Sequence, residues 1–223
     1  MSERALPERL RQEILGDLRP VRPLPRPGLR ALEVVPWAIA LFLLVPAVWP
    51  LRADAEELGW TLVWGAAIGE ALGGLALITL ALHEAVPGGG IGRVRAVLAL
   101  AGGAALQLAV GLATRANGAM HPEALAHRGP ACLAAQTVLA VPILAFSLWL
   151  VARALPVRPR WAGALCGLGA GIVADGVWHL ICPRIDLAHV LVWHGAATLL
   201  MAGAGWLLGV LWESRQARQS VQA

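Results

Sequence analysis

The stretch "WTLVWGAAIGEALGGLALITLAL", residues 60 to 82, contains one ionisable side chain, Glu70, in 23 positions. An α-helix needs about 20 mostly apolar residues to cross the hydrocarbon core of a bilayer. The sequence therefore predicts a transmembrane helix here, with a single carboxyl group near its middle.

Five further stretches have the length and apolarity that a membrane span requires. The six predicted spans are residues 34–51, 60–82, 94–113, 131–152, 161–181 and 187–211. Hydrophobic residues make up 58% of the 223 residues, charged residues make up 14%, and the mean hydropathy is +0.66. These values exclude an ordinary soluble domain and predict an all-α fold, a six-helix transmembrane bundle.

The arginines predict how this bundle is oriented. All 18 basic residues are Arg, and only Arg52, Arg115, Arg128 and Arg184 fall in the connections on one side of the predicted membrane. Because positive charge accumulates on the cytoplasmic side, both termini are expected in the cytoplasm. The predicted organisation is a cytoplasmic segment 1–32, a transmembrane domain 33–212 and a cytoplasmic tail 213–223. The arginines form no single basic face, which argues against direct binding of nucleic acid.

The N-terminal segment contains a second periodic pattern. Four apolar residues recur every fourth position between charged residues, namely Leu6, Leu10, Ile14 and Leu18. This spacing predicts a short amphipathic helix, which ends at Arg19-Pro20 and is followed by a stiff Pro-rich tether. An isolated helix of this length is marginal in water, so its apolar stripe needs a partner. The lipid bilayer surface and the groove of a soluble cytoplasmic protein both fit the spacing.

Small residues recur at four-residue spacing in two of the predicted spans. They are Gly65, Gly69 and Gly73 in the second span and Gly163, Gly167 and Gly171 in the fifth. Such stripes allow helix backbones to approach closely in lipid. We interpret them as packing surfaces within one bundle, in preference to a dimer interface.

Two of the three cysteines are predicted to lie close together. Cys132 begins the fourth span and Cys182 ends the fifth, at the same membrane surface. The midpoint of the two residue numbers is 157, which is also the centre of the connection between these antiparallel spans. The thiols should therefore lie at matching depth, where a disulfide or a shared ligand site is geometrically possible. Cys166 lies sixteen residues before Cys182, hence about 24 Å away along the helix, and is expected to serve in packing.

Ionisable side chains surround the second of these cysteines. Asp175, His179 and Cys182 share one face of the fifth span, and an imidazolium next to a thiol favours the thiolate. Four more histidines fall in the outer connections or just inside the sixth span: His121, His127, His189 and His194. Thiolate and imidazole together suit zinc, copper or cadmium. A structural disulfide, a reversible redox or thiophilic-metal switch and a permanent metal site all remain open, with a redox or metal-sensing role assigned to Cys132, Cys182 and His179.

Two carboxylates fall within the predicted spans, Glu70 in the second and Asp175 in the fifth. Ionisable groups inside a membrane usually face the bundle interior and serve a function. Together with Gln107, these two carboxylates are the polar side chains available for proton or ion translocation.

The chain resembles bacterial membrane anti-sigma factors of the negative-regulator-of-sigma-F (NrsF) type. The resemblance is carried by six spans, by the segment "GDLRPVRPLPRPGLRAL" at residues 16–32, and by the Cys132 and Cys182 pair before Pro183. It implies a bacterial inner-membrane protein that holds an extracytoplasmic-function sigma factor inactive. Oxidative or heavy-metal stress at the periplasmic side would release that factor. The N-terminal segment, with Leu6, Leu10, Ile14, Leu18 and Arg19, would bind the sigma factor, and Cys132 and Cys182 would be the sensing thiols.

This resemblance predicts a protein that is not an enzyme and has no resident cofactor, although a thiophilic metal ion could bind transiently. Two other classes use the same residues. A membrane thiol oxidoreductase would use Cys132 and Cys182 with a quinone, but it would ordinarily need a second cysteine pair, and Cys166 stands alone. A small proton-coupled transporter would be centred on Glu70 and Asp175.

Overall fold

The computed structural model describes residues 7–17, 23–118, 129–154 and 156–222, and the regular elements in these ranges are all helical. Six helices are long and apolar enough to cross a membrane: Pro27–Val48, Trp60–Glu84, Arg93–Asn117, Gly129–Ala152, Pro159–His179 and Leu187–Arg218. The prediction of an all-α protein with six candidate spans is thereby confirmed. The side of the membrane on which the termini lie stays a prediction.

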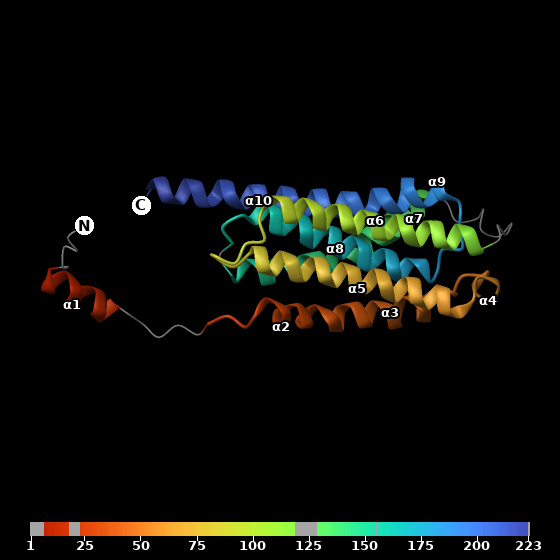
Figure 1. Cartoon of the computed structure of the whole chain (residues 1–223), viewed down its shortest axis with the longest axis horizontal. Helices are drawn as coiled ribbons and strands as arrows, with labels where there is room; N and C mark the ends of the chain where they lie inside the picture. Colours follow the sequence, from red (N-terminus) through yellow and green to blue (C-terminus); the bar gives the residue numbers. More distant parts are fainter. Residues whose placement is uncertain (1–6, 18–22, 119–128, 155, 223) are drawn as a thin grey trace.

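The long helices run side by side as one bundle (Figure 1). In chain order the helices are α1 (Glu8–Asp17), α2 (Pro27–Ala31), α3 (Val35–Val48), α4 (Ala55–Leu58), α5 (Trp60–Glu84), α6 (Arg93–Asn117), α7 (Gly129–Ala152), α8 (Pro159–His179), α9 (Leu187–His189) and α10 (Gly195–Gln222). Helix α1 and the C-terminal end of α10 lie at one end of the molecule, which we call the α1 end. Helices α4 and α9 lie at the other, the α4 end.

The first span shows how the prolines set helix boundaries. Pro27 begins α2, where its missing N–H costs no hydrogen bond, and a short 3₁₀ turn joins α2 to α3. Helix α3 continues through Pro46 and ends at Val48. Trp49 then adopts an extended backbone, with φ −113° and ψ 139°, as a residue followed by proline should. The chain next crosses the α4 end toward α5.

Helix α8 occupies the centre of the bundle. Within the most apolar 18 residues of α8, 94% of the residues are buried. The same fraction is 22% to 50% in the other five spans. Glycines make this position possible, because Gly163 and Gly167 face backbone carbonyls of α10. On its other side α8 meets α5, where a methyl group on Gly169 would lie 2.5 Å from the Gly74 carbonyl oxygen. Only a residue without a Cβ fits such contacts.

The two predicted glycine stripes have different environments. The stripe of the fifth span lies against α10, as expected for packing within one bundle. In the second span, a methyl group added at Gly65 or Gly69 would have no atom of the described chain within 4 Å, and one at Gly73 would meet only a leucine side chain. Our interpretation of this second stripe as a packing surface within the bundle is therefore wrong for Gly65 and Gly69. The close contact with α8 is made by the adjacent Gly74.

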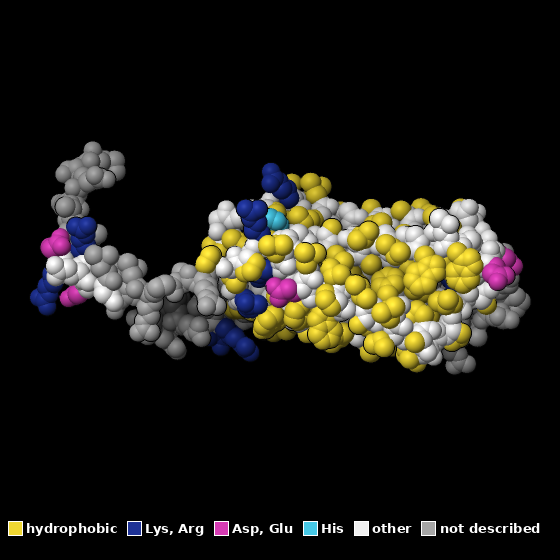
Figure 2. Space-filling model, turned by 90° about the horizontal axis from the view of Figure 1, so that it is seen from below, with side chains coloured by type: hydrophobic (Ala, Val, Ile, Leu, Met, Phe, Trp, Pro, Cys, Tyr) yellow, Lys and Arg dark blue, Asp and Glu magenta, His cyan; other side chains and the backbone are white. Residues whose placement is uncertain are grey.

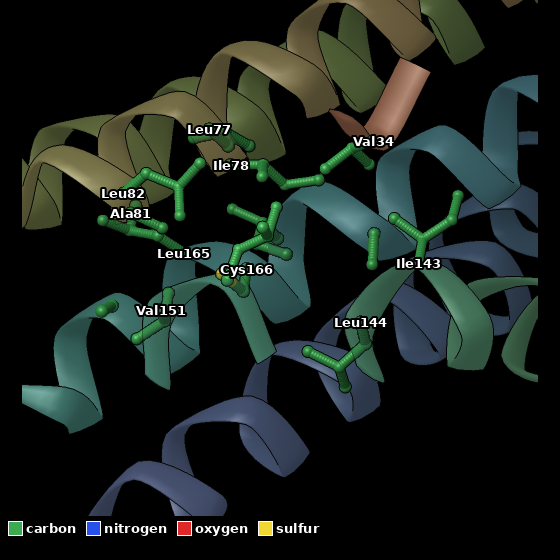
Figure 3. Packing of buried hydrophobic residues seen from close by; sticks show 14 of the residues in the cluster. Val34, Leu77, Ile78, Ala81, Leu82, Ile143, Leu144, Val151, Leu165 and Cys166 are labelled. Carbon is green, nitrogen blue, oxygen red and sulfur yellow. The ribbon is translucent and has the colours of Figure 1, made fainter. Parts of the chain in front are cut away.

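The apolar core lies between α5, α7 and α8, nearer the α1 end. Figure 3 shows side chains from these helices meeting there, with Cys166 among them. Cys166 is fully buried and serves in packing. On the outside, Figure 2 shows apolar side chains covering the visible flank of the bundle and arginines gathered toward the α1 end. This surface is what a hydrocarbon environment requires.

Candidate functional site

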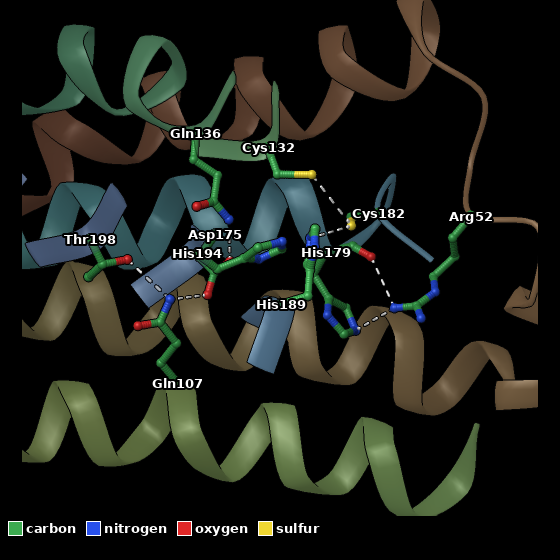
Figure 4. A network of polar contacts seen from close by, with 10 residues as sticks. All are labelled: Arg52, Gln107, Cys132, Gln136, Asp175, His179, Cys182, His189, His194 and Thr198. Atoms are coloured by element: carbon green, nitrogen blue, oxygen red, sulfur yellow. Dashed lines mark hydrogen bonds and ion pairs between the residues drawn. The ribbon is translucent and has the colours of Figure 1, made fainter. Parts of the chain in front are cut away.

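Two cysteines meet inside the α4 end of the bundle (Figure 4). Cys132 lies in the first turn of α7, and Cys182 follows the C-terminus of α8 by three residues. Their sulfur atoms are 3.8 Å apart, and both side chains are buried free thiols. The hairpin formed by α7 and α8 thus brings the two predicted thiols together.

Two histidines complete this group, and a local irregularity of the last span positions them. Residues Val190–His194 form a π-helical turn between α9 and α10. In a regular α-helix, residues five apart are rotated by about 140° from one another, at 100° per residue. The wider turn instead places the rings of His189 and His194 with centroids 5.3 Å apart.

The four side chains offer ligand atoms to a common point. His189 Nε2 lies 3.7 Å from the Cys182 sulfur. One ligand atom from each of Cys132, Cys182, His189 and His194 lies within 4.8 Å of all the others, and all four residues are buried. We call these four residues the Cys/His cluster.

A buried polar network supports the cluster from the bundle interior. His194 Nδ1 lies 2.7 Å from the Asp175 carboxylate, to which it donates a hydrogen bond. Gln107 and Gln136 donate to the same carboxylate at 2.6 Å and 2.5 Å, from α6 and α7 respectively. Asp175 therefore connects three neighbouring helices to α8, and its charge is stabilised by three donors.

The second intramembrane carboxyl group, Glu70 of α5, is also buried. Its Oε2 atom has no hydrogen-bond partner within the described part of the chain. Glu70 and Asp175 border the same cavity of about 20 Å³, which also touches Cys182 and His194. This volume accommodates about one water molecule or one ion.

His179 has a different environment from the one that its spacing suggests. Its Nε2 atom lies 3.3 Å from the Arg52 guanidinium, and it is not a member of the Cys/His cluster. Arg52 also forms a two-pronged ion pair with Asp54, with N–O distances of 2.6 Å and 2.8 Å. The sequence placed Asp175 and His179 on one face of the fifth span, but the ring bound to Asp175 is that of His194.

Asp186 fixes the start of the segment that carries both histidines. Its carboxylate accepts hydrogen bonds from the backbone N–H of His189 at 2.8 Å and from Arg184 at 2.7 Å. Partial burial of Asp186 works toward a higher pKa, but these two donors outweigh it, so the pKa of Asp186 is lowered. The ionised side chain thus caps α9 directly before the π-helical turn.

Periodicity in the sequence missed His189, His194 and Gln136 as members of the site. Both histidines were noted as part of a histidine-rich outer surface, but their five-residue spacing does not match one face of an α-helix. The residue types of Val190–His194 do not indicate a π-helical turn. Gln136 lies four residues after Cys132 on α7, and that spacing was the available signal.

The predicted sigma-binding residues are described only in part. Leu10 and Ile14 belong to α1, which confirms a helix there, but their side chains lie outside the described structure. Leu6, Leu18 and Arg19 lie outside the described residues, as do His121 and His127.

The Cys/His cluster supports two kinds of chemistry. Two thiols at this separation can be oxidised to a disulfide, and an oxidant then accepts two electrons while two protons are released. Alternatively, thiolates and neutral imidazoles can together coordinate a soft cation. Both reactions would change the contacts between the ends of α7, α8 and α10.

Comparison with known proteins identifies the family. The model of the family described as "negative regulator of sigma F" matches residues 15–212. A probable anti-sigma-F factor NrsF from Azospira oryzae is 39% identical over 72 residues, which cover 32% of this chain and 34% of that protein. The anti-sigma-F factor NrsF of Caulobacter vibrioides is 33% identical over 76 residues, or 32% of this chain and 36% of that protein.

These matched segments span about a third of the length of each relative. No solved structure matches the chain. The family model, by contrast, covers the tether, the first five spans and most of the sixth. The chain therefore belongs to the negative-regulator-of-sigma-F (NrsF) family.

Proposed function

We propose that this protein is a bacterial inner-membrane anti-sigma factor. In this proposal the N-terminal segment holds an extracytoplasmic-function sigma factor at the cytoplasmic face, and both termini are cytoplasmic. The observation that carries the proposal is the family match over residues 15–212. The two relatives named as anti-sigma-F factors support it, as does the helical segment α1, set apart from the bundle (Figure 1).

The signal, in this proposal, is redox or heavy-metal stress received by Cys132 and Cys182. The free thiols lie 3.8 Å apart between two helices, whereas the sulfurs of a disulfide lie about 2.05 Å apart. Oxidation would therefore draw the start of α7 toward the end of α8. For release to follow, the oxidised and reduced bundles must differ in affinity for the sigma factor.

Retention of the sigma factor is tested with the full-length protein purified in detergent. Co-purifying proteins are identified by mass spectrometry for the wild type, for Leu10→Asp/Ile14→Asp, and for Gln12→Asp/Gly16→Asp. The control variant adds the same charge at the same spacing on the opposite side of α1, where both residues are exposed. We expect a sigma factor with the wild type and the control, and none with the stripe variant. Equal recovery with the stripe variant would contradict a binding role for Leu10 and Ile14.

Release is tested in cells with a reporter for the sigma factor. Cys132→Ser/Cys182→Ser should abolish induction by an oxidant or by Cd²⁺. Cys166→Ser, which removes a buried thiol from the separate core, should leave induction unchanged. Normal induction in the double variant would rule out sensing by the cysteine pair.

A further inference from the structure

The atoms of the Cys/His cluster converge in a way that the predicted cysteine pair alone does not explain. Two sulfurs and two imidazole nitrogens approach one another within 4.8 Å inside a buried region. They come from three separate parts of the chain: the start of α7, the segment after α8, and the α9–α10 junction. Each part is held there by contacts of its own.

We propose that Cys132, Cys182, His189 and His194 form a four-coordinate site for a thiophilic divalent cation of the zinc and cadmium class. Asp175 is the outer carboxylate that positions His194. The regulatory meaning of this site rests on the proposed anti-sigma function, whereas the binding itself does not.

Two of the distances agree with tetrahedral coordination. Zinc–sulfur bonds of about 2.3 Å and zinc–nitrogen bonds of about 2.0–2.1 Å place two sulfurs about 3.8 Å apart, and a sulfur and a nitrogen about 3.6 Å apart. The cluster has 3.8 Å between the cysteine sulfurs and 3.7 Å between the Cys182 sulfur and His189 Nε2.

The hydrogen bonding of His194 also indicates a ligand. Nδ1 is occupied by Asp175, so Nε2 is the ring atom left to bind a ligand. This Nε2 atom is buried and has no hydrogen-bond partner in the described part of the chain. A buried polar atom without a partner is unfavourable, and a cation bound between Nε2 and the sulfurs satisfies it. Histidine ligands of metals commonly donate their other N–H to a carboxylate in this way.

The donor set determines which ions fit. Two thiolates neutralise the charge of a divalent cation, so the occupied centre avoids a net buried charge. Sulfur and imidazole nitrogen favour zinc and cadmium, whereas magnesium and calcium prefer oxygen ligands. The π-helical turn has a direct role here, because a regular helix would rotate His189 and His194 apart.

Metal binding is tested on the purified full-length protein in detergent, without a sigma factor. Titration with Zn²⁺ and with Cd²⁺ should each saturate at one ion per chain, and Co²⁺ should give the visible spectrum of a tetrahedral thiolate site. His189→Gln/His194→Gln should lower the affinity at least about 10-fold. The matched control His83→Gln removes an exposed imidazole from the far end of α5 and should bind as the wild type does.

The outer carboxylate has a separate test. Asp175→Asn retains an oxygen for His194 but weakens its hold on the ring, and should lower the metal affinity about 10–100-fold while the tetrahedral Co²⁺ spectrum persists. Unchanged affinity would overturn the positioning role of Asp175. Unchanged affinity of the double histidine variant would likewise overturn a four-ligand site.

Zinc-edge X-ray absorption of the wild type requires no variant and is therefore unaffected by misfolding. We expect two sulfur neighbours at about 2.3 Å and two nitrogen neighbours at about 2.0–2.1 Å. An environment of oxygen and nitrogen alone, or no bound zinc, would overturn the proposal. Because sigma retention is measured separately, absent zinc with a bound sigma factor refutes the site alone. Bound zinc without any sigma factor refutes the proposed function instead.

Discussion

Arg52 and Asp54 lie where the chain between α3 and α4 crosses the end of α8. Their side chains are 1% and 0% exposed and form a two-pronged ion pair. The backbone N–H of Arg52 also donates to the Leu180 carbonyl at 2.9 Å, and its guanidinium reaches the carbonyl of His179 at 3.3 Å. Arg52 thus satisfies carbonyl groups that the end of α8 leaves without helical partners.

Removing one member of this pair should be strongly destabilising. Arg52→Gln leaves a buried carboxylate without its ion partner, which typically costs about 3–5 kcal/mol. Arg52→Leu/Asp54→Leu removes both charges and should recover much of that loss. The free energy of unfolding is measured by titrating the detergent-solubilised protein with dodecyl sulfate. Arg184→Gln, at the partly exposed pair with Asp186, is the comparison and should cost less. A double variant no more stable than Arg52→Gln would contradict this account.

Among the elements, the interface of α8 with α10 depends on residues that lack side chains. Gly167 packs directly on the backbone of α10 at Met201, and Gly171 lies against Thr198, whose Cα would be 2.9 Å from an added methyl group. Because packed interiors deform little, a methyl group here must push the two helices apart.

Two Gly→Ala substitutions should therefore have opposite effects. Gly167→Ala should lower the free energy of unfolding by about 1–3 kcal/mol through overpacking. Gly69→Ala, on the open face of α5, should be neutral or stabilising by up to about 1 kcal/mol, since alanine is the better helix former. The same dodecyl sulfate titration measures both. Equal losses at the two positions would show that α10 does not pack closely on Gly167.

These elements also show what the sequence can and cannot predict. Length and apolarity sufficed for the six spans, because the bilayer imposes one strong requirement on each. The position of Cys132 beside Cys182 followed from the antiparallel hairpin alone. Periodicity did not reveal that Gly69 faces outward while Gly74 meets α8. A periodic pattern shows which residues share one face of a helix, but it does not show which other helix packs against that face. It also missed His194, which only a change of helix type brings beside His189.

On the scale of the whole molecule, the α1 end and the α4 end differ in charge. The described residues of two connections, 85–92 and 153–154 with 156–158, and the start of α8 lie at the α1 end, where Figure 2 shows the arginines gathered. Arg30 is buried at this end and donates to the Leu150 carbonyl of α7. The tether is thus joined to the same helix whose opposite end carries Cys132.

The positive-inside rule predicts that the α1 end is cytoplasmic. Green fluorescent protein fused after the C-terminus should fluoresce, and alkaline phosphatase at that position should be inactive. Alkaline phosphatase fused after Gly118, at the end of α6, should be active, because that enzyme folds only outside the cytoplasm. The reverse pattern would place the Cys/His cluster on the cytoplasmic side and rule out periplasmic sensing.

The burial of α8 has a consequence for biosynthesis. It has the lowest hydropathy of the six spans, 1.3, and it carries Asp175, an ionisable residue of the kind that is costly inside a bilayer. A helix of this kind partitions poorly into lipid by itself. Because α5 and α7 leave the ribosome before α8 and α10 leaves after it, we expect α8 to insert against α5 and α7 and to be enclosed only when α10 follows. Assembly of the bundle is thereby coupled to completion of the chain.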